Sequence, residues 1–414
     1  MRARARASLT SFDIPAFRWL VLSNYALWGA WTVETLTQGW LVLELTDSPF
    51  WVGAAVGVRG INQLVFSLVG GAIADRVDRR HLLIVANFIG AAGALAVAVL
   101  VVGGWIELWH VLVSLAVAGV VSAIVNPTFS ALTFDVVGPA RILTANAFYF
   151  MGGAVLRVAA ALAAGFALDR LGVGPSYLLV AAIYALGAVS VWPLKAAARE
   201  LHTEPALRAM GSGLRYALGT PAIRSALYLS LITEIFGFAY MFMMPVLARD
   251  VLVVGATGLG ALTAAAAAGQ FLAMVALASL GDVRRKGALL VGSTLGFGLA
   301  VAGFSLSPWF ALSLVLAAAV GATASLYDSS MATTLQVTVS TEMRGRVLGL
   351  YAATWGSSQL GGFAVGALAT VVSVPLALAL FGAVVAVNAL WFVPRADAFA
   401  RVPAPVDQES REPA

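Results

Sequence analysis

The sequence has no cysteine and little charge. Without cysteine the chain has no disulfide, no thiolate nucleophile and no cysteine-ligated zinc or iron–sulfur site. Asp, Glu, Lys and Arg make up only 11% of its 414 residues, whereas about 25% is usual in a soluble protein. The three histidines, His81, His110 and His202, are too widely spaced to form a metal-ligand motif. These shortages exclude a soluble enzyme as the default, and we expect no metal and no cofactor.

The apolar residues instead predict an integral membrane protein. They make up 61% of the chain, and the mean hydropathy is +0.92. Runs of about 20 residues, which span ~30 Å of hydrocarbon as a helix, recur throughout and are too long and continuous for barrel strands. We predict an all-α membrane protein with twelve transmembrane helices, at residues 17–43, 50–74, 81–103, 108–132, 144–168, 175–194, 223–247, 256–281, 287–306, 309–334, 345–371 and 374–394.

Basic residues are unequally divided between the predicted loops. If the N-terminus is cytosolic, 21 of the 25 Lys and Arg residues fall in cytosolic segments, as the positive-inside rule requires. Only Arg170 and Arg249 fall outside, and only Arg59 and Arg157 fall within the spans away from their cytosolic ends. We therefore expect the net charge of +5 to set topology in the cell (inner or plasma) membrane, with both termini cytosolic, and not to bind nucleic acid.

The two halves of the chain have related sequences. The loop segment at Asp75 is echoed at Asp282, 207 residues further on, and Gly53 and Gly260 are the same distance apart. Parallel repeats of this kind build many secondary transporters, whose substrate site lies between the halves near the bilayer midplane. We divide the chain into a cytosolic N-terminal arm (1–16), an N-terminal six-helix bundle (17–194), a cytosolic connector (195–222), a C-terminal six-helix bundle (223–394) and a disordered cytosolic tail (395–414).

A motif in the loop after the helix predicted at 50–74 points to a known family. Its residues are Gly71, Asp75, Arg76, Arg79 and Arg80, in the pattern Gly-x3-Asp-Arg-x2-Arg-Arg. The motif resembles the loop signature of the major facilitator superfamily. The stretches at 40–49, 141–147 and 344–349 are similar to the bacterial branch that contains the enterobactin exporter and macrolide-type efflux pumps. The resemblance implies the two-bundle fold of that superfamily and transport by alternating access.

The resemblance also implies a role for this loop. In the superfamily the loop aspartate, here Asp75, lies near the N-terminus of the helix predicted at 345–371, where a carboxylate gains roughly 0.3–1 kcal/mol from the helix dipole. Because the contact exists in only one conformation, it acts as a latch. We expect this latch to involve Gly71, Asp75, Arg76, Arg79, Arg80, Asp282 and Arg344. The alternative is a basic loop that only sets topology.

Five acidic or basic residues lie deep within the predicted spans, away from the first residues of each: Glu34, Arg59, Arg157, Glu234 and Asp328. A charge at this depth costs at least ~2.5–3.5 kcal/mol, so each should face a partner or a water-filled cavity. Desolvation disfavours the charged form of a carboxylate, which allows a buried acid to exchange a proton near neutral pH. We predict that Glu34 or Glu234 couples proton movement to transport, with Arg157 as the cationic partner. Static ion pairs that only fix the packing are the alternative.

The helix predicted at 144–168 departs from the pattern of this branch. Ala160 and Ala161 stand where the branch usually has Gly-Pro, an element associated with antiporters, and Gln359 stands where proline is common. The loss of Gly-Pro weakens the inference of proton antiport. It also predicts a straighter helix, since proline is a usual source of kinks.

Polar, aromatic and methionine side chains within the spans are candidates for lining the cavity. Aromatic rings and methionines adapt to bulky apolar ligands, although a Trp or Tyr near a span end is more often an interfacial anchor. The candidates are Asn24, Tyr25, Trp28, Gln38, Asn62, Gln63, Asn126, Tyr149, Met241, Met243, Met244 and Gln359.

The sequence leaves three functions open. It contains no nucleotide-binding loop and no catalytic triad pattern, so we expect a transporter driven by a gradient and not an enzyme. The first function is efflux of an amphipathic small molecule, a drug or siderophore, coupled to protons. The second is uptake or facilitated transport of an anionic metabolite or lipid, with Arg157 binding the anionic group. The third is a transporter-like sensor or scaffold. We expect a monomer in the lipid bilayer.

Overall fold

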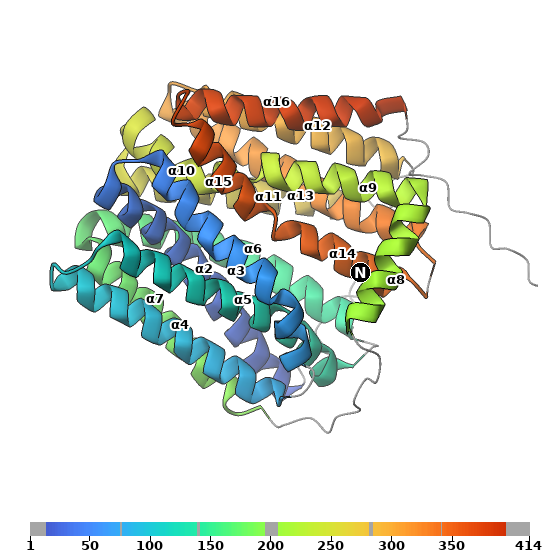
Figure 1. Cartoon of the computed structure of the whole chain (residues 1–414), viewed down its shortest axis with the longest axis horizontal. Coiled ribbons are helices and arrows are strands. Elements are labelled where there is room, and N and C mark those ends of the chain that lie inside the picture. The colour runs from blue at the N-terminus through green and yellow to red at the C-terminus, as the bar shows by residue number, and fades with distance from the viewer. Residues whose placement is uncertain are drawn as a thin grey trace, which may run out of the picture.

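The protein is built of helices joined by short connections. The computed structural model describes residues 14–74, 77–138, 141–194, 206–280, 285–340 and 342–394, and these residues include no strand. The first half forms α2 (Pro15–Thr46), α3 (Pro49–Ala74), α4 (Arg79–Val102), α5 (Leu108–Val137), α6 (Ile142–Leu171) and α7 (Val173–Val191). The second half forms α8 (Ala206–Gly219), α9 (Pro221–Ile232), η2 (Thr233–Gly237), α10 (Tyr240–Val246), η3 (Leu247–Val251), α11 (Gly255–Leu280), α12 (Lys286–Ser305), α13 (Phe310–Thr338), α14 (Arg344–Trp355), α15 (Ser358–Leu368) and α16 (Val374–Phe392). The halves lie side by side, blue to green and yellow-green to red in Figure 1.

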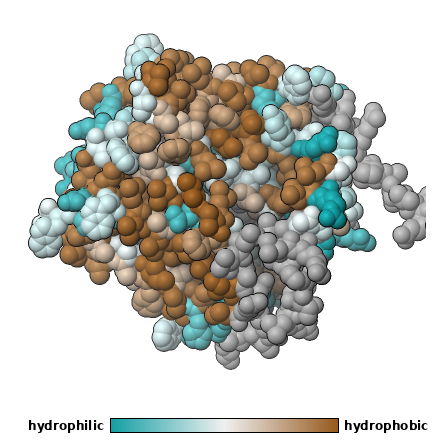
Figure 2. Space-filling model, in the orientation of Figure 1, coloured by the Kyte–Doolittle hydropathy of each residue, from teal (hydrophilic) through white to brown (hydrophobic). Residues whose placement is uncertain are grey.

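The outer surface of this assembly is apolar. Figure 2 shows hydrophobic residues over most of the face in view. Large side chains such as Val113 and Trp391 are more than half exposed, which is costly in water and favourable in hydrocarbon. Eight helical segments of the described chain are long and apolar enough to cross a membrane: Arg79–Val102, Leu108–Val137, Val173–Val191, Pro221–Val251, Gly255–Leu280, Lys286–Ser305, Phe310–Thr338 and Val374–Phe392. The all-α membrane class predicted from the sequence is confirmed.

Two of the twelve predicted helices are interrupted. The run predicted at 223–247 ends as a regular α-helix at Ile232 and continues through the π-helical turn η2. The run predicted at 345–371 breaks at Gly356 and Ser357, between α14 and α15. A Gly-Ser pair and a π-bulge are both known causes of helix kinks, and hydrophobic periodicity over a window of 20 residues does not detect either. In contrast, α6 is continuous over 30 residues, as expected without its proline.

Glycine residues bring the two halves into close contact. A Cβ atom on Gly53 of α3 would lie 2.5 Å from the carbonyl oxygen of Gly362 in α15. A Cβ atom on Gly260 of α11 would lie 2.9 Å from the Cα atom of Gly165 in α6. Small residues of this kind let membrane helices approach backbone to backbone. The repeated pair Gly53 and Gly260 therefore occupies the corresponding position in each half, at the contact with the other half.

The molecule has two ends, which we name after residues in the connections. The Asp47 end is where α2 leads into α3, and the Asp78 end is where α3 leads into α4. Since Gly53 lies near the start of α3 and Gly165 near the end of α6, both close contacts between the halves lie toward the Asp47 end. At the Asp78 end, Arg346 of α14 donates a hydrogen bond to Ser212 of the connecting helix α8, with a distance of 2.6 Å.

Candidate functional site

A buried ion pair lies inside the N-terminal half. The guanidinium of Arg59 in α3 is 3.6 Å from the carboxylate of Glu34 in α2. Tyr184 of α7 donates a hydrogen bond to the same carboxylate at 2.9 Å, and Arg59 donates one to the hydroxyl of Ser122 in α5 at 3.4 Å. Four helices therefore supply partners, and both charged side chains are only 10% exposed. The two opposite charges therefore compensate each other in a site of low exposure.

The depth of this pair follows from the helix positions. Glu34 and Arg59 lie roughly 15–18 Å along α2 and α3 from the Asp47 end, at ~1.5 Å per residue. This is about half the ~30 Å thickness of the hydrocarbon core. Charged side chains at such a depth are expensive unless they are paired, which explains why the acid and the base occur together.

The C-terminal half contains a buried acid without such compensation. Glu234 is 3% exposed, and its Oε1 atom has no hydrogen-bond partner among the described residues. It lies in the π-helical turn η2, which interrupts the helix between α9 and α10. Nearby in space, the half-buried Asp328 of α13 accepts a hydrogen bond from Tyr351 of α14 at 3.2 Å. A π-bulge is a common device for presenting a functional side chain inside a helix.

Arg157 does not form the ion pair that the sequence predicted for it. Its guanidinium donates a hydrogen bond to Gln270 of α11 at 3.0 Å and lies 5.8 Å from the ring centre of Trp28. Among the described residues it forms no ion pair with Glu34 or Glu234. In this structure Arg59 pairs with Glu34 instead, and helix periodicity could not show that Arg59 lies closer to it.

A small cavity between the halves contains Arg157. Its volume is about 40 Å³, and its lining comes from α2, α6, α10 and α11. Trp31, Thr35, Tyr240, Met241 and Met244 contribute to this lining. An aromatic and methionine-rich wall around one cation suits an amphipathic ligand that carries an acidic or electron-rich group.

The other predicted cavity residues are distributed more widely. Gln359 of α15 donates a hydrogen bond to Gln63 of α3 at 2.8 Å, across the two halves. Tyr25 donates to the carbonyl of Phe148 within the N-terminal half. Trp28 and Asn126 are exposed, and Asn62 donates a hydrogen bond to the carbonyl of Val58 in its own helix. The remaining candidates are buried: Asn24, Gln38, Tyr149 and Met243.

Sequence reasoning missed the uncharged partners of the charged residues. Ser122, Tyr184, Gln270 and Tyr351 each bond to one of them. Each is a single polar residue in an apolar stretch, as is Ser190, whose hydroxyl bonds only to its own helix. The sequence pattern is the same for a polar residue that bonds to a buried charged residue and for one that bonds to its own helix. Only the three-dimensional arrangement distinguishes the two.

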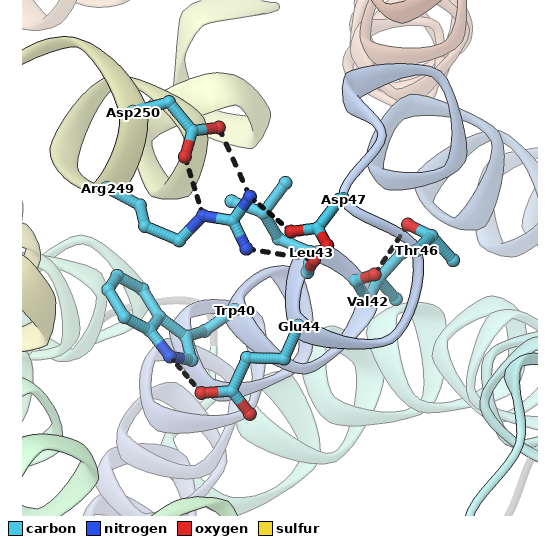
Figure 3. A network of polar contacts seen from close by, with 8 residues as sticks. All are labelled: Trp40, Val42, Leu43, Glu44, Thr46, Asp47, Arg249 and Asp250. Carbon is cyan, nitrogen blue, oxygen red and sulfur yellow. Dashed lines mark hydrogen bonds and ion pairs between the residues drawn. The ribbon is translucent and has the colours of Figure 1, made fainter.

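A second polar network joins the halves at the Asp47 end (Figure 3). Arg249 of η3 lies 2.9 Å from the carboxylate of Asp47 and donates a hydrogen bond to the carbonyl of Leu43 at 3.0 Å. Asp250 accepts a further hydrogen bond from Arg249 at 2.6 Å. Leu43 lies near the C-terminus of α2, where the helix dipole favours a cation, and its carbonyl also accepts a hydrogen bond from the backbone amide of Asp47. Arg249 therefore fastens the C-terminal half to the end of α2.

The loop motif at the Asp78 end is described only in part. Asp75, Arg76 and Asp282 lie outside the described residues, and Gly71 and Arg344 belong to α3 and α14. Arg79 pairs with Asp135 of α5, and Arg80 donates a hydrogen bond to the carbonyl of Trp192 at 2.5 Å. These two contacts fasten the start of α4 within the N-terminal half.

Asp78 caps the first turn of α4. Its carboxylate accepts a hydrogen bond from the backbone amide of Arg80 at 2.8 Å and lies 2.9 Å from the His81 ring. Burial raises the pKa of Asp78, but the hydrogen bonds from Arg80 and His81 outweigh it and hold the pKa below its usual value. Within the described part of the chain, no cluster of three potential metal ligands occurs.

Comparison with known proteins agrees with this architecture. A family model for transmembrane secretion effectors of the major facilitator superfamily matches residues 6–409. The enterobactin exporter EntS of Shigella flexneri is 27% identical over 375 residues, which cover 85% of this chain and 83% of that protein. EntS of Escherichia coli O139:H28 is 27% identical over 374 residues, which cover 85% and 84% of the two chains.

Solved structures share the fold. A bacterial homologue of the human lysosomal transporter Spinster, in an inward-facing and unoccupied conformation, has a TM-score of 0.70 at 15% identity and covers 93% of this chain and 95% of that chain. A mutant of the nucleoside transporter NupG has a TM-score of 0.71 at 15% identity, with 93% and 99% coverage. At this level of identity the likeness concerns the fold alone.

Proposed function

Because the chain belongs to the transmembrane secretion effector family of the major facilitator superfamily, we propose that it exports an amphipathic small molecule by proton-coupled alternating access. Twelve crossings, one for each apolar run, would complete the two six-helix bundles. Relatives named enterobactin exporters support a siderophore-like or drug-like substrate. The substrate would bind between the halves and leave on the opposite side when the bundles rock about it.

The observation that carries the coupling proposal is the environment of Glu234. A buried carboxylate without a partner is costly as an anion, and a bound proton removes that cost. Asp328 adds a second negative charge nearby, which disfavours ionisation of both acids together. A conformational change that admitted water to Glu234 would release its proton. We propose Glu234, with Asp328 and Tyr351, as the proton-carrying group and Glu34 as a structural one.

Arg157 is the proposed anchor for the polar group of the substrate. It lines the cavity between the halves, it is held by the neutral Gln270, and it has no carboxylate partner among the described residues. A free cation next to Trp28 and Tyr240 would attract a catecholate or carboxylate group while the rings pack on its apolar part. The flexible methionine side chains of the lining would accommodate substrates whose apolar parts differ in shape.

Arg249 is the proposed gate. Arginine placement favours a cytosolic Asp78 end and an external Asp47 end. The contacts of Arg249 with Asp47 and Leu43 would then close the external side. We propose that they open when the bundles rock, while the Asp75 loop and the start of α14 close on the cytosolic side.

The test of this proposal is transport by proteoliposomes of purified protein, with enterobactin as the first probe. An imposed pH gradient should drive enterobactin across the membrane, and Glu234→Gln should stop this while leaving exchange of labelled for unlabelled enterobactin intact, because exchange needs no net proton movement. Gradient-driven transport that survives Glu234→Gln would refute the assignment of Glu234. No transport of enterobactin or of a panel of drugs by the unaltered protein would count against export itself.

Uptake of an anionic compound by the same fold is the second candidate, and Arg157 is the observation that favours it. Expression in cells separates the two directions. An exporter lowers the cellular level of its substrate, and an importer raises it. In either case Arg157→Gln should weaken binding of an anionic substrate.

A further inference from the structure

A groove opens between α4 and α5, within the N-terminal half. Its volume is about 270 Å³, which exceeds that of the cavity between the halves. Positions spaced by three or four residues line it on both helices, from Ile89 to Leu100 and from Trp109 to Ser122. Glu34 and Tyr184 form its floor. Glu34 of the buried ion pair therefore lines this groove and not the cavity that contains Arg157.

Small residues on α4 create the space. Between Ile89 and Val97, the small residues Gly90, Gly93, Ala94 and Ala96 line the α4 wall. A Cβ atom on Gly93 would meet only the hydroxyl of Ser114, at 3.9 Å. The glycine is therefore not required by close helix packing, and the space beside it is open.

The groove opens onto the apolar outer surface. Ile89, Val113 and Val117 on its walls are 42%, 54% and 43% exposed. Figure 1 places α4 at the edge of the molecule opposite the C-terminal half. In a membrane this edge contacts hydrocarbon, so the molecules that reach the groove are those dissolved in the bilayer.

The length and the rim of the groove match one leaflet of a bilayer. From Ile89 to Leu100 it extends roughly 16–17 Å, at ~1.5 Å per residue, which is a little over half of the ~30 Å hydrocarbon core. At the Asp47 end its rim carries Trp109, stacked on His110 at 3.7 Å and donating a hydrogen bond to Glu107 at 2.8 Å. A Trp with polar neighbours at a helix end is typical of the headgroup level.

We propose that this groove binds one acyl chain of a membrane phospholipid, with the headgroup beside Trp109 and His110 and the chain end near Glu34. The bound chain keeps water away from the Glu34–Arg59 pair, which strengthens the attraction between the two charges. Because the groove lies within one bundle, rocking of the two bundles leaves it intact, so its ligand stays in place while the substrate moves. The proposal needs only that the chain lies in a bilayer and is independent of the proposed export.

The test uses protein in lipid nanodiscs that contain phosphatidylethanolamine with a photoreactive diazirine in its acyl chain. Mapping of the crosslinked peptides should place the label on the facing segments of α4 and α5. Gly93→Leu, which fills the groove, should lower this crosslinking roughly tenfold, equivalent to about 1.4 kcal/mol of binding. Ala96→Leu, at an exposed position on the same wall, gives a second variant that need not disturb the fold.

Gly292→Leu is the matched control, because Gly292 is an exposed glycine of α12 with no neighbouring atom within 4 Å. It should leave the crosslinking unchanged, and all variants should elute as the unaltered protein does. Unchanged crosslinking in both groove variants would overturn the proposal, as would label confined to other helices. Displacement of the lipid label by an excess of enterobactin would also overturn it, since the groove would then take the substrate.

Discussion

Each half of the molecule contains a buried glutamate, and the two glutamates have opposite surroundings. Glu34 pairs with Arg59 and accepts a hydrogen bond from Tyr184. Glu234 lies in a π-helical turn with one oxygen unpartnered among the described residues. A buried carboxylate that is paired with a base is stable in its charged form and holds the neighbouring helices together. A buried carboxylate without such a base is stable mainly when it is protonated. Under the proposed function, this difference separates a structural acid from an acid that carries a proton.

The largest expected effect comes from removing the acid of Glu234. In Glu234→Gln, transport driven by a pH gradient should fall to the level of protein-free liposomes, because the neutral amide cannot release a proton. Transport into proteoliposomes measures this effect. Glu34→Gln/Arg59→Met, which removes both charges of the buried pair together, is the control in the other half and should retain a substantial part of the gradient-driven rate. Equal losses in both variants would remove the distinction between the two acids.

The next effect concerns stability in the N-terminal half. Arg59→Met leaves Glu34 as an uncompensated buried charge and should destabilise the fold by about 3–5 kcal/mol, the usual result of removing one partner of a buried pair. Unfolding of the purified protein by a denaturing detergent measures this cost. The double variant Glu34→Gln/Arg59→Met should recover most of it. If the double variant were as unstable as Arg59→Met, the pair would not be the cause.

Substrate affinity should change next, through the cavity between the halves. Arg157→Gln keeps a polar side chain within reach of Gln270 but removes the charge, and it should weaken binding of an anionic substrate roughly tenfold, or about 1.4 kcal/mol. Isothermal titration of the purified protein measures this. A neutral substrate of similar size should bind equally to both proteins, and an equal loss for both substrates would indicate damage to the fold.

A smaller effect should follow at the Asp47 end. Arg249→Ala removes the contacts with Asp47 and Leu43, and the partly exposed pair with Asp47 is worth about 0.2–1 kcal/mol. The population with this end open should therefore rise by a few-fold at most. Distances between spin labels on the two halves at this end report the change. A shift toward the closed form would contradict the role of Arg249 as a gate.

The smallest effect concerns the cap of α4. The folded-state pKa of Asp78 lies below its unfolded value, so its stabilising contribution is present above the unfolded pKa near 4 and is lost as pH falls through the folded pKa. Asp78→Ala should therefore speed hydrogen exchange in the first turn of α4 at pH 7, as loss of an N-cap does. The two proteins should become alike at acidic pH, and a difference that grew on acidification would contradict this sign.

The sequence predicted the elements that depend on composition and spacing. The length of each apolar run predicted a helix there. The repeated glycines Gly53 and Gly260 lie at corresponding contacts between the halves. It also selected Glu34, Arg59, Arg157, Glu234 and Asp328 as buried or half-buried ionisable residues, because charge is rare in hydrocarbon.

The pairing of these residues could not be predicted. Whether Glu34 meets Arg59 or Arg157 depends on how α3 and α6 are rotated about their own axes. A helix that is apolar on all sides has no polar face from which this rotation could be predicted. The π-turn at Glu234 and the break at Gly356 depend on tertiary packing, since their local sequences are also compatible with a continuous helix. The groove beside Glu34 is lined by residues of α2, α4, α5 and α7, and the pattern of a single helix does not show which residues of other helices it meets.

The most direct test of the difference between the two acids is a measurement of proton movement itself. Proteoliposomes without a pH gradient, given an inward gradient of enterobactin, should show substrate-driven proton flux with a pH-sensitive dye trapped inside. We expect Glu34→Gln/Arg59→Met to retain this flux and Glu234→Gln to abolish it while still exchanging substrate. Flux that persists in Glu234→Gln and disappears in Glu34→Gln/Arg59→Met would contradict this expectation.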